Sequence, residues 1–152
     1  MMVLIVLIFI VLAVTYSWNA NVAQPKLGTV VSLEVSQGGM LGMQSVGFDA
    51  KGRITATQTN YTGTSTTQTK TGVLNDTMRT TIILATLQKH DATRITNDPT
   101  PPPDTNTSRI QFEVDGQKYD LRCTEIGSAC SKLADELFAN FASILTHQKG
   151  GD

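Results

Sequence analysis

The residues of this chain that could do chemistry are few, and its two cysteines are the first to consider. Cys123 and Cys130 lie close enough in sequence to close a short local loop. A zinc site would need more ligands at suitable spacing, and His90 and His147 are both distant from the cysteines. We therefore predict a Cys123–Cys130 disulfide that stabilises the fold by about 2 to 3 kcal/mol, with two buried free thiols as the alternative.

Catalytic groups are not evident in the sequence. His90 and His147 each fall at the C-terminal end of a predicted helix, where the helix dipole stabilises an imidazolium without any catalytic role. No G-x-S-x-G, H-E-x-x-H, P-loop or Rossmann glycine pattern occurs. We interpret the carboxylates on predicted strand faces, turns and helix surfaces as solvated; these carboxylates are Glu34, Asp49, Glu113, Asp115, Asp120, Asp135 and Glu136. We predict a protein that is not an enzyme and holds no metal or cofactor.

An apolar stretch within a predicted turn is the most unusual local feature. In VSQGGMLGMQ the glycines Gly38, Gly39 and Gly42 surround Met40 and Leu41, and Met43 follows. Turns are normally built from Gly, Asn, Asp, Ser or Pro, so large apolar side chains need another reason. Glycines that adopt positive φ would direct these side chains outward as an anchor for a partner's pocket. Alternatively, the side chains fold back over the open end of the sheet.

Length and composition indicate one small exported domain. The chain has 152 residues, 40% of them hydrophobic, a formal net charge of -1 and no Lys/Arg cluster, which argues against nucleic acid as a partner. The run MMVLIVLIFIVLAV predicts a signal peptide or an N-terminal membrane anchor over residues 1–23, and the domain over 24–152. Membrane contact is expected only through the N-terminal segment if it is not cleaved. A disulfide suits an exported chain.

Three sequons could accept N-linked glycan in an exported protein, at Asn60, Asn75 and Asn106. In a chain this rich in threonine, chance also explains them.

Hydrophobic periodicity predicts three strands followed by a helix. The strands are expected over Thr29–Ser36, Gln44–Ala50 and Arg53–Tyr61, because their apolar residues alternate with polar ones. The next segment, Thr62–Gly72, contains no apolar side chain and is predicted to be a mobile surface loop. Asn75 can cap a helix that ends near Lys89 and His90, although the β-branched run Thr80–Thr86 would also fit a strand.

The second half of the chain predicts a hairpin and a long helix. A proline-rich stretch, Asp98–Asp104, is expected to be a stiff linker. The following segment, Arg109–Arg122, alternates around Asp115-Gly116, which predicts a two-residue turn that pairs Phe112 with Tyr119 and Ile110 with Leu121. The last helix is expected to begin at Ser128, to end at Lys149 and Gly150, and to bury one stripe of residues: Leu133, Leu137, Phe138, Phe141, Ile144 and Leu145.

These elements predict an α+β fold. An antiparallel sheet of about five strands would carry two helices on one face, in the order β-β-β-α-β-β-α, after the apolar N-terminal segment. The predicted disulfide would tie the end of the last strand to the first turn of the last helix.

The same residues suggest a family. The stretch Ser-Gln-Gly-Gly-Met-Leu-Gly after the first strand, a mid-chain helix, and Ile-Gln-Phe-Glu-Val-Asp-Gly-Gln-Lys-Tyr-Asp-Leu before a terminal helix resemble the emfourins, small protein inhibitors of thermolysin-like zinc metalloproteases. The resemblance covers Val30 to about Leu145. Where emfourins typically have Ser-Gly-Gly-Phe-Ala-Gly, this chain inserts Gln37 and replaces Phe-Ala by Met40-Leu41.

The resemblance implies that the chain occludes a protease cleft. Residues Gly38 to Met43 would form the protease-binding loop, with Met40 or Leu41 in the pocket that accepts a bulky apolar residue after the cleaved bond. The implied partner is a secreted or periplasmic metalloprotease, and no cofactor is needed. The alternative function is a non-inhibitory envelope or extracellular structural or adhesion module of the same fold.

Overall fold

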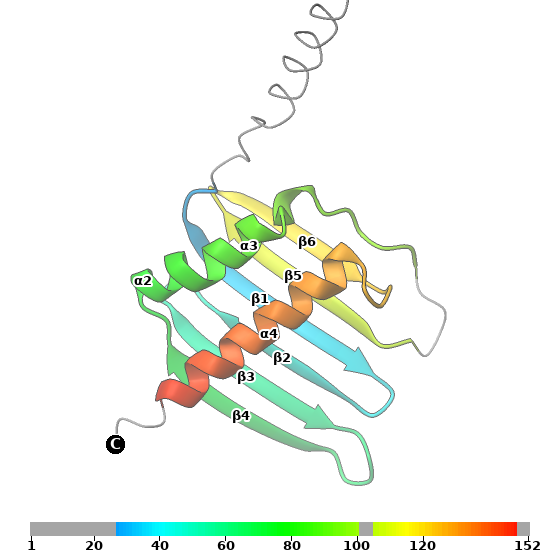
Figure 1. The fold of residues 1–152 in the computed structure, drawn as a ribbon. Helices are drawn as coiled ribbons and strands as arrows, with labels where there is room; N and C mark the ends of the chain where they lie inside the picture. The colour runs from blue at the N-terminus through cyan, green and yellow to red at the C-terminus, as the bar shows by residue number, and fades with distance from the viewer. Residues whose placement is uncertain (1–26, 101–104, 149–152) are drawn as a thin grey trace, which may run out of the picture.

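The computed structural model describes residues 27–100 and 105–148 and shows one antiparallel sheet with helices on one face (Figure 1). The α+β prediction is confirmed. The sheet has six strands in the order β4-β3-β2-β1-β5-β6, so β2 and β1 lie in its middle and the fifth strand pairs with the first. The strands are β1 (Val30–Gly39), β2 (Gly42–Phe48), β3 (Arg53–Asn60), β4 (Thr66–Val73), β5 (Thr107–Val114) and β6 (Gln117–Cys123).

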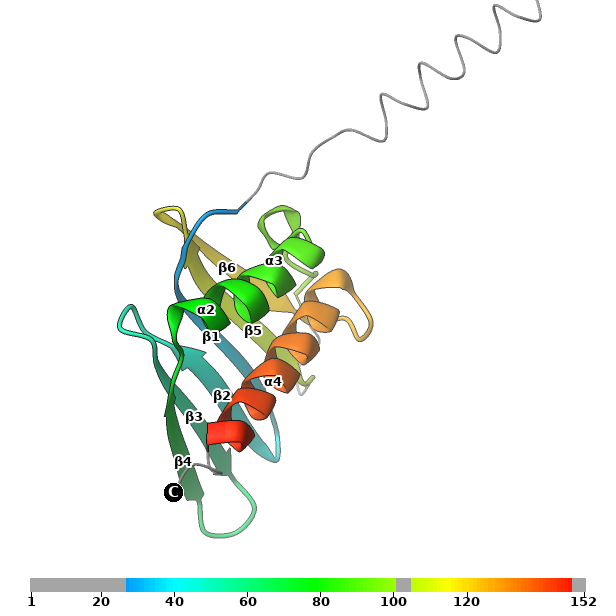
Figure 2. The same cartoon turned by 60° about the vertical axis from the view of Figure 1, so that its left-hand side comes forward.

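The second layer consists of two helical segments. The first is continuous from Asp76 to Lys89 and comprises α2 (Asp76–Met78), a π-helical stretch η1 (Arg79–Leu84) and α3 (Ala85–Lys89). A short 3₁₀ turn, η2 (Ala92–Arg94), follows, and the long helix α4 (Ala129–Gln148) closes the described chain. Figure 2 shows both segments on the same side of the sheet.

Both helices begin at capping residues that the sequence indicated. Asn75 Oδ1 accepts a hydrogen bond from the backbone N–H of Met78 at 2.8 Å, and Ser128 Oγ accepts one from the N–H of Ser131 at 3.1 Å. The run that also fitted a strand is helical, and hydroxyls within it bond the preceding turn: Thr81 to the Thr77 carbonyl and Thr86 to the Ile82 carbonyl, both at 2.8 Å. This back-bonding satisfies the polar groups of threonine inside a helix.

The hairpin prediction is confirmed in register as well as in position. Phe112 pairs with Tyr119 and Ile110 with Leu121 across β5 and β6. The turn residues Asp115 and Gly116 have φ of 52° and 74°, the left-handed conformation that a two-residue hairpin turn requires. Asp115 also accepts hydrogen bonds from the backbone N–H groups of Gly28 at 2.9 Å and Thr29 at 3.1 Å. The turn therefore fixes the chain as it enters β1.

The prediction of a surface loop over Thr62–Gly72 is wrong for most of its length. Residues Thr66–Val73 form β4, which pairs with β3 from Asn60 opposite Thr66 to Arg53 opposite Val73. The strand is almost wholly exposed, because it is the edge of the sheet and the C-terminal end of α4 reaches it only near Gly72 and Val73. An edge strand needs no apolar face, and its threonines favour extended backbone, so hydrophobic periodicity missed it.

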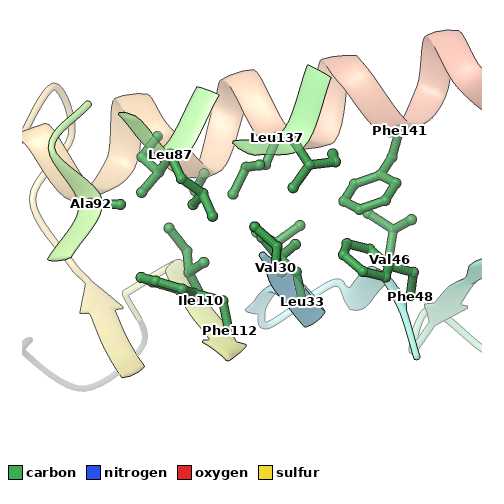
Figure 3. Close-up of a cluster of buried hydrophobic side chains, with 14 of the residues drawn as sticks. Val30, Leu33, Val46, Phe48, Leu87, Ala92, Ile110, Phe112, Leu137 and Phe141 are labelled. Carbon is green, nitrogen blue, oxygen red and sulfur yellow. The ribbon is translucent and has the colours of Figure 1, made fainter. Parts of the chain in front are cut away.

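The core lies between the sheet and the helices. Phe141 of α4 faces Phe48 of β2, with ring centroids 6.3 Å apart, and Leu137 points toward the β1 residues Val30 and Leu33 (Figure 3). The stripe predicted for the last helix is confirmed, although Phe138 and Leu145 are only partly buried; its fully buried members are Leu133, Leu137, Phe141 and Ile144.

The disulfide prediction is also confirmed. Cys123 at the end of β6 is bonded to Cys130 in the first turn of α4, and both residues are buried. This pairing is consistent with an extracellular location. Within the described ranges, no helix is both long and apolar enough to cross a bilayer.

Some predictions fall on residues that the structure does not describe. These are the leader over 1–23, the first residues of the domain from 24, the last four residues of the proline-rich stretch (101–104), and the expected helix stop at Lys149 and Gly150.

Candidate functional site

The apolar turn between β1 and β2 is exposed. Met40 and Leu41 form the two-residue connection between the paired residues Gly39 and Gly42, and each retains 73% of its accessible surface. Met43, on β2, retains 45%. Of the two alternatives, the structure therefore shows the outward arrangement rather than side chains folded over the sheet. Figure 1 shows this turn at the far end of β1 from the point where the chain enters the sheet.

The expected reason for the glycines is wrong. The described glycines with positive φ are Gly52, Gly63, Gly116 and Gly127, which include none of those in the apolar turn. Gly39 and Gly42 are instead required by close approach. A side chain on Gly42 would lie 2.4 Å from the Thr59 carbonyl oxygen, and one on Gly39 would lie 1.7 Å from the Asn106 side-chain oxygen.

The turn is held on both sides by the sheet. The carbonyl of Leu41 accepts a hydrogen bond from the N–H of Tyr61 at 3.0 Å, which links the turn to the chain beyond β3. On the other side, Gly38 pairs with Thr107 of β5. Behind the turn, the side chains of Gln44 and Gln37 are hydrogen-bonded at 2.9 Å. Since β1 and β2 are central strands, the two exposed side chains stand on a rigid support.

Other exposed apolar residues lie at the same end of the sheet. Tyr61 follows β3 and is 51% exposed, and Ile126 follows β6 and is fully exposed. A surface depression borders the turn, and its lining includes Met40, Leu41, Met43 and the β3 residues Gln58 and Thr59. Sequence reasoning missed Tyr61 and Ile126, because only the pairing of strands shows that Tyr61 lies beside the turn and that Ile126 lies at the same end of the sheet.

The loop that carries Ile126 is fixed by a buried disulfide and a carboxylate. Asp98 Oδ2 accepts hydrogen bonds from the N–H groups of Thr124 at 2.8 Å and Glu125 at 3.0 Å, and from the Ser128 hydroxyl at 2.9 Å. Partial burial raises the pKa of the Asp98 carboxyl, but these three donors outweigh it and hold the pKa below its usual value. The described start of the proline-rich stretch therefore has a structural role.

The two histidines occupy places that need no catalytic role. Nε2 of His90 lies 2.7 Å from Glu136 of α4, and Lys89 Nζ binds the same carboxylate at 2.8 Å. Hydrogen bonds from His90 and then Lys89 lower the pKa of Glu136, and the cluster joins α3 to α4. The ring of His147 donates to the Ser143 carbonyl through Nδ1 at 2.7 Å.

The carboxylates interpreted as solvated are exposed or half-buried, and several of them have defined partners. Asp120 forms a paired hydrogen bond with Arg109, at 2.7 and 2.6 Å, and this contact lowers its pKa. The Asp49 carboxylate accepts hydrogen bonds from the backbone N–H and from the guanidinium of Arg53. The backbone bond lowers the pKa of Asp49 most, and the guanidinium bond lowers it next. Over the described ranges, no group of three or more His, Cys, Asp and Glu side chains is arranged to hold a metal ion.

The three sequon asparagines lie on the surface, in different surroundings. Asn60 ends β3 and is exposed. Asn75 uses its side-chain oxygen as the helix cap, and Asn106 packs its side chain over Gly39 beside the apolar turn. Glycan at these positions stays a prediction.

No family model and no curated protein matches this chain. The resemblance to emfourins therefore rests on the residues quoted above.

Proposed function

We propose that this protein is an exported inhibitor that inserts the turn at Met40 and Leu41 into the active-site cleft of a thermolysin-like zinc metalloprotease. The observation that supports the proposal is the exposure of two adjacent bulky apolar side chains on a narrow, glycine-flanked turn. Exposing both side chains to water does not stabilise the fold, whereas burying them in a partner's apolar pocket would stabilise a complex.

The rigidity of the turn supports inhibition rather than cleavage. Loop ordering normally weakens binding, and a turn already held by Tyr61 and by two neighbouring strands avoids most of that cost. The turn itself has only two residues between paired strands, so it is narrow enough to enter a cleft. The mechanism requires no catalytic group, metal or cofactor from this chain.

The experiment is a titration of a thermolysin-like protease with the purified domain from Gln24 onward, reading the cleavage of a small peptide substrate. We expect activity to fall to a stoichiometric endpoint. The variant Met40→Asp with Leu41→Asp should weaken inhibition about 100-fold or more, because each apolar anchor in a pocket contributes about 2 kcal/mol.

A control is Val73→Asp, which places a negative charge on another exposed apolar position, at the end of β4 away from the turn. It should inhibit as the wild type does. Full protease activity in the presence of excess wild-type protein, across several such proteases, would contradict the proposal. That result would favour the alternative of an extracellular structural or adhesion module, for which the exposed edge strand β4 is the supporting observation.

A further inference from the structure

The two edge strands of the sheet, β6 and β4, differ in how their outward backbone groups are covered. At β6, Arg122 is covered by the preceding segment: its N–H donates to Asn97 Oδ1 at 2.7 Å, and its carbonyl accepts from the Asp98 N–H at 3.0 Å. At β4, the described part of the chain covers only Val73 in this way. Its N–H donates to Gln148 Oε1 at 3.0 Å, and its carbonyl accepts from Gln148 Nε2. From Thr66 to Thr71 every residue of β4 is exposed.

The contacts of Val73 and Leu74 reveal which backbone groups of β4 point outward. Leu74 N–H bonds the Gly52 carbonyl at 2.7 Å and so faces β3, whereas Val73 faces away from it. Backbone direction alternates along a strand, so Thr71, Thr69 and Thr67 also present N–H and C=O groups away from β3. Gln68 and Lys70 direct theirs towards β3. Exposed edges of this kind pair readily with another strand.

The sequence of this edge is complementary to itself. If a second β4 lies antiparallel with Thr69 opposite Thr69, Thr67 lies opposite Thr71, and about six main-chain hydrogen bonds can form. The strand carries one charged residue, Lys70, and this register places it opposite Gln68 rather than opposite its own copy. Threonine pairs across antiparallel strands are favourable, and the sheet already has one in the hydroxyl contact of Thr59 with Thr67 at 3.1 Å.

We propose that β4 pairs with β4 of a second copy of this chain, centred on Thr69, to join two six-stranded sheets into one. Gln148 occupies the edge at Val73 and limits the pairing to residues 67–71. This short interface is much smaller than the roughly 800 Å² per partner of a stable complex, so the dimer forms at high protein concentration. The interface is separate from the apolar turn, and the inference does not depend on the proposed function.

The test combines sedimentation with amide hydrogen exchange, from about 10 µM to about 1 mM protein. We expect mass to rise towards a dimer, and the amides of Thr67, Thr69 and Thr71 to become protected as it does. Gln68 and Lys70 are internal controls, because their amides face β3 and should be protected at every concentration. A monomer at 1 mM overturns the proposal, as does protection of the three outward amides at every concentration.

Thr69→Pro is the diagnostic variant. Proline removes an outward N–H and is tolerated on edge strands, so the monomer should fold, which thermal unfolding verifies, while dimerisation is lost. Lys118→Pro is the matched control on the opposite edge: two steps of alternation from Arg122 place its N–H outward too. It should dimerise as the wild type does. A dimer that survives Thr69→Pro, or one lost in Lys118→Pro, overturns the assignment to β4.

Discussion

Single glycines determine how closely the strands approach one another beneath the exposed turn. Gly42 faces the backbone of β3, whereas Gly39 faces the end of an exposed side chain, Asn106. The two positions look equivalent in the sequence, and the notion that both supply positive φ is wrong. The two positions differ in how well they tolerate a side chain, because the backbone carbonyl next to Gly42 cannot move without shifting its strand.

Alanine substitution at Gly42 and Gly39 tests this difference. We expect Gly42→Ala to destabilise the fold by about 1 to 3 kcal/mol, the usual cost of overpacking, because the new Cβ would lie 2.4 Å from the Thr59 carbonyl oxygen. Gly39→Ala should be milder, since the Asn106 side chain can rotate away. Denaturant midpoints of the two variants measure the difference, and equal losses would contradict it.

At the level of elements, the hydrophobic pattern predicted the helices and strands that have one buried face and missed the strand that is exposed. The hairpin around Asp115-Gly116 and the last helix could be predicted because one face of each contacts the core. The edge strand β4 has no buried face, so its sequence looked like a loop. In the candidate site, the run Gly38–Met43 could be identified from composition, but its outward direction depends on tertiary packing.

The disulfide joins two elements, and its removal tests how much that closure contributes. We expect Cys123→Ala with Cys130→Ala to lower the free energy of unfolding by about 2 to 3 kcal/mol, from the entropy of an eight-residue loop. Urea unfolding of the wild type under reducing conditions is the comparison, and it should approach the double variant. An unchanged midpoint on reduction would show that the hydrogen bonds to Asp98 suffice to hold the loop.

Across the whole molecule, paired carboxylates make the fold sensitive to acid. Asp49, Asp98, Asp120 and Glu136 all have a lowered pKa in the folded state. The folded protein therefore binds fewer protons than the unfolded chain in the acidic range. Their stabilisation is fully present above the unfolded pKa values of 3.8 for aspartate and 4.5 for glutamate, and is lost as pH falls through the folded values.

Asp98→Asn isolates one of these contributions. The variant should be less stable than the wild type at neutral pH, because the amide is a weaker acceptor than the carboxylate for its three donors. The two proteins should converge in stability as the wild-type carboxyl becomes protonated. Urea midpoints between about pH 7 and pH 2 measure this, and parallel curves over that range would contradict the assignment.

The direction of β1 has a practical consequence for presenting the molecule on a surface. The strand runs ten residues from Val30, next to the chain's entry at Leu27, to Gly39 at the exposed turn. At about 3.3 Å per residue, roughly 30 Å separates these two ends. A linker, bead or sensor chip attached ahead of Leu27 is therefore joined at the end opposite Met40 and Leu41. Immobilised in that orientation, the domain acts as its own spacer and leaves the turn accessible to a partner in solution.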